Sequence, residues 1–460
     1  MEKKRKSRLK ISTMELLAMG FLGIIFLGGV LLWLPACNKE PITFTDALFT
    51  STTAVCVTGL VTVVPAAQFT ILGQVILLIL IQVGGLGVMA CMCAFFLIIR
   101  KHITVRERIM IQETYSMDSL SGMVRFIRWV LKGTFIVEGI GAVFYALQFV
   151  PEYGLVRGIW YSVFHAVSAF CNAGVDILGD SSLIRYVSNP IVNFTTMALI
   201  VFSGLGFIVW NELWQAIKRK WKEKCSLKLS ISRLSVHTKL VLIVTTVLIV
   251  GGTVNFFLME YSNPGTMGKL TFGEKWMAAA FHSISTRTAG FSTIPQALLR
   301  EESMVITCIL MFIGGSPGGT AGGIKTTTVA LLILACITMV RGGKDIECFG
   351  RKIPTANFRT GFTVFMIAFL AHLAGTVAIT AIEGGGHSFI NILYETTSAI
   401  GTVGLTADLT PKLHIASKYI IMVMMYMGRL GPMTLALVFG NRAHPRDKIR
   451  ELPESKIFLG

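Results

Sequence analysis

The stretch FTSTTAVCVTGLVTV, residues 49–63, recurs in altered form three more times along the chain. The other copies are FHAVSAFCNAGVDIL (164–178), FHSISTRTAGFSTI (281–294) and YETTSAIGTVGLTAD (394–408). Each copy begins with an aromatic residue and leads, nine or ten residues later, to a glycine: Gly59, Gly174, Gly290 and Gly404. Because about ten residues of α-helix cover only about 15 Å, such a segment cannot cross a bilayer. It must return to the side from which it entered.

Long apolar runs flank each copy, and a second glycine landmark lies in the run that follows: GGLG (84–87), SGLG (203–206), GGSPG (314–318) and GRLG (428–431). The pattern predicts an all-α polytopic membrane protein with four helix–pore-loop–helix units around a pseudo-fourfold central pore and eight spanning helices. We expect the units at 1–110, 111–230, 231–350 and 351–460. The expected first helices are 14–34, 124–150, 238–260 and 361–382, and the second helices are 70–98, 190–214, 303–340 (interrupted) and 417–440.

Composition and charge agree with a chain that lies in a membrane. Of its 460 residues, 53% are hydrophobic and only 15% are charged, against about 25% charged in soluble domains. The net charge of +17 comes from short basic clusters beside the apolar runs, which does not favour nucleic-acid binding. These clusters precede each first helix and follow each second one, so we expect both termini on the cytoplasmic side of the plasma membrane, in contact with lipid.

The four re-entrant segments suggest a cation pore. Irregular backbone at membrane depth is tolerated where it lines a water-filled cavity, and backbone carbonyls can replace the hydration shell of a cation. Glycine supports such loops because it adopts conformations that a Cβ forbids. No ring of Asp or Glu lies next to the glycines, which argues against a carboxylate-lined filter. The alternative is that these glycines only allow helices to pack closely.

The third unit differs, because its second helix is interrupted by GGSPGGTAGGIKTTT (314–328). This glycine-rich segment cannot be a stable helix, and we interpret it as a gate, against the alternative of a static break. The expected gate residues are Gly314, Gly315, Gly318, Gly319, Gly322, Gly323 and Lys325. The segment also matches G-x-S-x-G, but a nucleophile elbow needs a strand–turn–helix with a histidine and an acid nearby, so we do not expect an enzyme.

Arg429 falls near the middle of the last apolar run. A charge at that depth must face the protein interior and be paired. We expect it to bind carbonyl groups of the interrupted segment and to hold the gate; the alternatives are a salt bridge to Glu138 and a lipid-shielded position. His165 and His282, near the start of two pore helices, are assigned no function.

Together, VCVTGL, FCNAG, TRTAGF, TVGL and GRLG resemble the Trk/Ktr/HKT superfamily of K⁺ transporters, and its KtrB (NtpJ-like) branch in particular. The resemblance covers the whole chain and implies K⁺ uptake, often stimulated by Na⁺, without an organic cofactor. It also implies a bacterial homodimer that sits on a cytoplasmic ring of KtrA-like, nucleotide-binding regulatory subunits. The second loop departs from the pattern, with Val175 where phenylalanine is expected. The resemblance implies that the K⁺ filter consists of Val57, Thr58, Gly59, Asn172, Ala173, Gly174, Thr288, Ala289, Gly290, Thr402, Val403 and Gly404.

One other class of transport stays open at this point. A secondary transporter for Na⁺ or another monovalent cation would work by alternating access, usually with two inverted repeats. The four units here have the same orientation, which favours the pore.

Overall fold

The computed structural model describes residues 13–87, 91, 122–223 and 232–431. Four of the helices in this part are long and apolar enough to cross a membrane. They are the predicted first helices of the four units, α1 (Thr13–Trp33), α7 (Met123–Tyr153), α12 (Val236–Glu260) and α16 (Thr355–Glu383). The sequence prediction of these spans is confirmed, with ends that differ by a few residues.

A shorter helix packs against each long one. These four shorter helices are the predicted pore helices. With 13 to 16 residues, each covers only about 20–24 Å. The N-terminus of the first is capped by the hydroxyl of Thr43, and that of the third by a capping box between Thr271 and Glu274. The four are α2 (Phe44–Cys56), α8 (Leu155–Phe170), α13 (Phe272–Ser285) and α17 (Phe389–Gly401).

The aromatic residue that opens each repeated stretch is an anchor of the core. Phe49, Phe164, Phe281 and Tyr394 are all fully buried, one in each pore helix. The hydroxyl of Tyr394 donates to Oε1 of Gln296 at 2.8 Å. The repeated aromatic in the sequence therefore marks the point where each pore helix is fixed in the bundle.

The second helices are α4 (Ile71–Leu86), α9 (Pro190–Gly204), α14 (Glu301–Phe312) and α18 (Ile415–Leu430), and each ends at its glycine landmark. Gly87, Gly206 and Gly431 have positive φ values of 83°, 92° and 82°, which glycine adopts readily and which do not continue a helix. The prediction of one continuous helix over 190–214 is wrong, because the chain bends by 98° after Gly204 into α10 (Phe207–Glu223). In the third unit a loop precedes α15 (Thr326–Val340). The predicted continuations to 98 and 440 lie outside the described residues, apart from Cys91.

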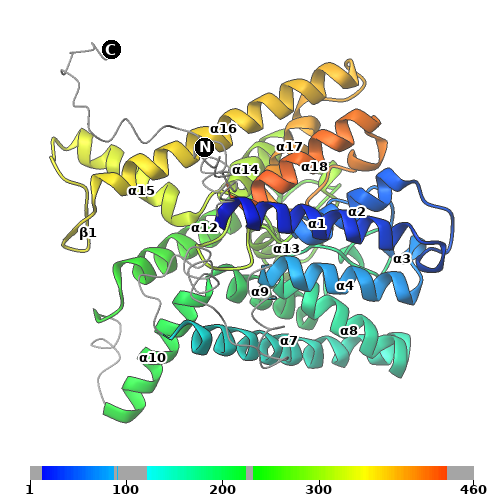
Figure 1. Ribbon diagram of the computed structural model, residues 1–460, viewed down its shortest axis with the longest axis horizontal. Helices are drawn as coiled ribbons and strands as arrows, with labels where there is room; N and C mark the ends of the chain where they lie inside the picture. Colours follow the sequence, from blue (N-terminus) through cyan, green and yellow to red (C-terminus); the bar gives the residue numbers. More distant parts are fainter. Residues whose placement is uncertain (1–12, 88–90, 92–121, 224–231, 432–460) are drawn as a thin grey trace, which may run out of the picture.

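Short elements complete the units. One helical turn lies between each pore loop and its second helix: α3 (Pro65–Gln68), η2 (Ile184–Tyr186), η3 (Gln296–Leu298) and η4 (Thr410–Lys412), while η1 (Pro35–Cys37) follows α1. Strands β1 (Glu347–Cys348) and β2 (Arg351–Lys352) form an antiparallel hairpin that pairs Glu347 with Lys352. The hairpin and α3 lie at opposite ends of the molecule (Figure 1).

The expected unit boundaries stay predictions. Those near 110 and 230 fall in segments outside the described residues, and the one at 350 falls in the turn between β1 and β2.

Candidate functional site: four loops around one axis

The four pore helices end in the same backbone conformation. Two residues before each repeated glycine, the chain adopts a left-handed conformation at Val57, Asn172, Thr288 and Thr402, with φ of 54°, 59°, 64° and 51°. This conformation costs a residue with a Cβ about 1–2 kcal/mol, and it persists where the surroundings enforce it. The fourfold recurrence of the strained residue shows that the four loops are built alike.

The four glycines meet around a single axis. Gly59, Gly174, Gly290 and Gly404 all have positive φ, between 64° and 96°. A Cβ on each glycine would collide with the next loop, at the carbonyl oxygen that precedes the next glycine. A Cβ on Gly59 would lie 2.7 Å from the oxygen of Ala173, and one on Gly174 would lie 2.6 Å from the oxygen of Ala289. A Cβ on Gly290 would lie 2.5 Å from the oxygen of Val403, and one on Gly404 would overlap the oxygen of Thr58. The order of contacts runs through units one to four and returns to one, so the ring is closed.

A buried hydroxyl near the end of each pore helix holds its loop. The amide of Gly59 donates to Oγ1 of Thr53 at 2.9 Å, and the amide of Gly404 donates to Oγ of Ser398 at 2.9 Å. In the other two units the hydroxyl donates instead, from Ser168 to the carbonyl of Val175 at 2.6 Å and from Ser285 to the carbonyl of Phe291. Sequence reasoning missed these four residues, although a Ser or Thr stands five or six residues before every repeated glycine.

The shorter spacing in the third copy also has a structural reason. In the other units the amide before the glycine bonds to a carbonyl five residues back, as from Ala173 to Ser168 at 2.8 Å. In the third, Ala289 bonds to Ser285, four residues back, at 3.0 Å. The tighter turn compensates for the one residue fewer in the third copy, so Gly290 stays in register with the other glycines.

Oxygen atoms without a hydrogen-bond partner remain beside the ring. The side-chain oxygens of Thr58, Thr288 and Thr402 are buried and unpaired in the described structure. Asn172 accepts a bond of 2.9 Å from the hydroxyl of Ser203. Within the described residues there is no cluster of His, Cys, Asp and Glu suited to a metal ion. The donors available to a cation here are carbonyl and hydroxyl oxygens, which suit hard cations.

The loop between α14 and α15 folds back on itself. The amide of Gly314 donates to the carbonyl of Ile324 at 2.9 Å, and that of Thr326 donates to the carbonyl of Gly315 at 3.1 Å. The hydroxyls of Ser316 and Thr326 are 2.9 Å apart. The predicted gate residues from Gly314 to Lys325 therefore belong to one compact turn.

This turn is bonded to the ends of other units. The amide of Ser316 donates to the carbonyl of Gly204, and the hydroxyl of Thr320 donates to the carbonyl of Phe170, the last residue of α8. A Cβ on Gly322 would overlap the hydroxyl oxygen of Thr402. The loop thus lies directly against the pore loops of units two and four.

Arg429 connects the turn to the first unit. Its guanidinium donates to the carbonyls of Thr320 and Gly84, and to that of Gly85 at 3.1 Å. Pairing with carbonyls of the interrupted segment agrees with the sequence interpretation, whereas the contacts to α4 were not expected. Lys325 donates to the carbonyl of Ala321 at 2.8 Å, within the same turn.

The other polar residues singled out in the sequence have structural partners. Glu138 accepts a bond of 3.0 Å from Gln82. His165 lies 2.7 Å from the carbonyl of Tyr161, and His282 lies 3.1 Å from the hydroxyl of Thr307. These contacts join neighbouring helices or turns and do not involve the glycine ring.

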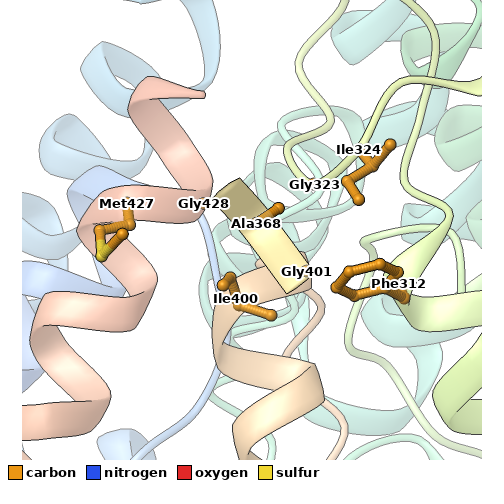
Figure 2. A pocket seen from close by; sticks show the side chains of 8 residues that line it. All are labelled: Phe312, Gly323, Ile324, Ala368, Ile400, Gly401, Met427 and Gly428. Atoms are coloured by element: carbon orange, nitrogen blue, oxygen red, sulfur yellow. The ribbon is translucent and has the colours of Figure 1, made fainter. Parts of the chain in front are cut away.

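One apolar pocket adjoins the turn on the side of unit four (Figure 2). The ring of Phe312 and the side chains of Ile324 and Ile400 surround it. Its remaining wall is made by Gly323, Ala368, Gly401, Met427 and Gly428. Apolar side chains and glycines therefore line the space beside the turn on this side.

One carboxyl group stands close to the ring glycines in sequence. Asp176 follows Gly174 by two residues, so their Cα atoms are at most about 7 Å apart. Burial raises the pKa of Asp176 to about 6, although its Oδ1 accepts a bond of 3.3 Å from the amide of Leu178.

Known proteins match this chain along nearly its whole length. The chain is 38% identical to the potassium/sodium uptake protein NtpJ of Enterococcus hirae, with 99% of both chains covered. It is 35% identical to the Ktr system potassium uptake protein B of Vibrio alginolyticus (99% of this chain, 97% of the relative), and 36% identical to that of Bacillus subtilis (97% and 96%).

The fold is also found in a solved structure. The potassium transporter TrkH from Vibrio parahaemolyticus matches with a TM-score of 0.74, over 97% of this chain and 87% of that one, at 17% identity. The model of the TrkH family, described as cation transport proteins, matches residues 5–452. The chain therefore belongs to the TrkH family of cation transport proteins.

Proposed function

We propose that this protein takes up K⁺ through the ring formed by Gly59, Gly174, Gly290 and Gly404. The closed cyclic contact of the four loops is the observation that carries the proposal. Relatives that match nearly end to end are named as potassium or potassium/sodium uptake proteins, which supports the choice of ion.

The loops supply what a cation needs after it loses water. Each loop contributes three residues, its glycine and the two residues before it. The twelve predicted filter residues of the four loops thus form the walls of one passage. The C-terminal ends of the pore helices lead into these loops, and their partial negative charge favours a cation there. Selectivity for K⁺ follows from the spacing of the carbonyl groups, which the buried hydroxyls of Thr53, Ser168, Ser285 and Ser398 hold in place.

The turn from Gly314 to Lys325 acts as the gate of this passage. A position in which the turn obstructs the path is supported by its hydrogen bond to Phe170, at the end of α8, and by the close approach of Gly322 to Thr402. Arg429 stabilises the obstructing position by binding the carbonyl of Thr320. Opening requires that this bond be released.

The remaining features follow from the resemblance to Ktr systems. The protein works as a homodimer in the bacterial plasma membrane, with both termini cytoplasmic, and a KtrA-like nucleotide-binding ring sets the position of the gate. Na⁺ stimulates uptake or accompanies K⁺. The designation of two relatives as components of a Ktr system supports a multi-component assembly.

Complementation tests this function directly. The full chain is expressed, with and without a KtrA-like partner, in a bacterial strain that lacks its own K⁺ uptake, and growth at low K⁺ and ⁸⁶Rb⁺ uptake are measured while Na⁺ is varied. Rescue with Na⁺-dependent Rb⁺ uptake is expected. Failure to rescue while the protein is present in the membrane, together with ²²Na⁺ uptake that K⁺ does not inhibit, would favour a Na⁺ transporter.

A further inference from the structure

Helix α10 leaves the bundle almost at a right angle. After Gly204 the chain turns by 98°, and Gly206 permits the turn with a φ of 92°. In Figure 1, α10 points away from the bundle, across the direction of α1 and α7. The long helices cross the membrane, and α10 runs across their direction next to Ser235, at the start of the long helix α12. A helix so placed runs along the membrane surface.

The outward face of α10 combines apolar and basic side chains. Trp214, Ile217 and Trp221 are 47%, 50% and 80% exposed, and their spacing of three and four residues puts them on one side of the helix. Lys218, Lys220 and Lys222 are exposed beside this stripe. The ammonium of Lys218 lies 5.3 Å from the centre of the Trp214 ring.

The opposite face fixes the helix to the bundle. Ala216 and Val209 are buried on that face. At the start of the helix, the indole of Trp210 donates to the carbonyl of Phe202 at 2.7 Å. The carboxylate of Glu212 accepts from the amide of Ser235, which caps α12, at 2.6 Å. The orientation of the Trp–Lys face is thus set by the fold, so this face cannot turn inward.

We propose that this face of α10 lies in the bilayer interface and binds anionic phospholipid headgroups. Tryptophan prefers the level of the headgroups, and lysine at that depth pairs with lipid phosphate. The perpendicular orientation, the apolar stripe and the adjacent positive charges together are typical of an interfacial helix. A second protein surface would not need this alignment with the plane of the membrane.

The same helix is bonded to the turn proposed above as the gate. The amide of Phe207, the first residue of α10, donates to the carbonyl of Gly318 at 2.9 Å, and a Cβ on Gly318 would be in van der Waals contact with Ile208. Lipid that holds α10 in this place also holds the turn in its present position. This link, unlike the lipid site itself, rests on the proposed function of the turn.

Fluorescence of the full-length protein in vesicles tests the lipid site. Brominated lipids quench nearby tryptophans, and the difference between the wild type and the Trp214→Phe/Trp221→Phe variant isolates the two residues. We expect brominated phosphatidylglycerol to quench them about twofold more than brominated phosphatidylcholine at equal mole fraction. The Lys218→Gln/Lys220→Gln/Lys222→Gln variant should lose this preference. The matched Arg157→Gln/Lys269→Gln/Lys412→Gln variant, which removes three exposed charges elsewhere, should keep it.

Equal quenching by the two lipids overturns the anionic site, and no quenching by either means that protein covers this face. Rubidium flux in the same vesicles tests the link separately. We expect phosphatidylglycerol to lower the flux of the wild type about threefold and to leave that of the lysine variant unchanged. A charge-dependent quenching with no effect of lipid on flux overturns the link to the turn, while the lipid site stands. Absence of any flux counts against the proposed transport function alone.

Discussion

Replacement of Gly290 by serine should lower the preference for K⁺ over Na⁺. Gly290 has a φ of 82°, and a Cβ there would lie 2.5 Å from the carbonyl oxygen of Val403, 3.1 Å from the Cα of Gly174 and 3.2 Å from that of Gly404. The loops must therefore separate by roughly half an ångström to restore normal contact distances. A side chain in this conformation also costs about 1–2 kcal/mol.

The expected loss of selectivity follows from these energies. If the displaced carbonyls cost K⁺ about 1.4 kcal/mol of binding relative to Na⁺, the ratio of the two uptake rates falls about tenfold. The assay is inhibition of ⁸⁶Rb⁺ uptake by K⁺ and Na⁺ in cells without other K⁺ uptake. Gly273→Ser is the matched control, because Gly273 lies in the same unit and a Cβ there has no neighbour within 4 Å. A folded, transporting Gly290→Ser protein with unchanged selectivity would refute the assignment of this loop to the filter.

Three further predictions concern the proposed gate and Asp176. Arg429→Ala removes the charged bonds to Thr320 and α4, each worth about 1.5–3 kcal/mol, and should raise Rb⁺ flux without the regulatory partner about tenfold; unchanged flux from a folded variant puts the gate elsewhere. Gly322→Ala should also raise flux, because its Cβ overlaps the hydroxyl of Thr402, and the added Thr402→Ala should reverse the rise; an increase that persists in the double variant contradicts the overlap. Because burial raises the pKa of Asp176 to about 6, its carboxyl is charged above that pH and neutral below it. Uptake at limiting K⁺ should therefore fall as external pH drops from about 7.5 to about 5.5, and Asp176→Asn should flatten the profile; an unaltered profile shows that Asp176 does not attract the ion.

The sequence was sufficient to predict the long helices and the pore helices. Their signals are local: apolar runs of spanning length, and an aromatic residue at a fixed distance from a glycine in four copies. The convergence of the loops followed from their number and register, since four half-length segments must share a polar interior.

Other features depend on contacts that the sequence does not display. The apolar residues continue past Gly206, so composition hides the bend that separates α9 from α10. The hydroxyl of Thr53 could be recognised as a support of the loop only when its bond to the amide of Gly59 was seen. For Arg429, the cost of an isolated buried charge predicted carbonyl partners. The hydrogen bonds to the carbonyls of Gly84 and Gly85, however, arise from the packing of α18 against the first unit.

The four strained residues at the pore-helix ends have one more consequence. They are Val57, Asn172, Thr288 and Thr402, three different amino acids at equivalent places in a single chain. A pore assembled from four identical subunits changes all four quarters with every mutation. Here one codon alters one quarter, so selection can change each loop of the proposed filter separately and can keep differences between the quarters that a symmetric assembly would erase.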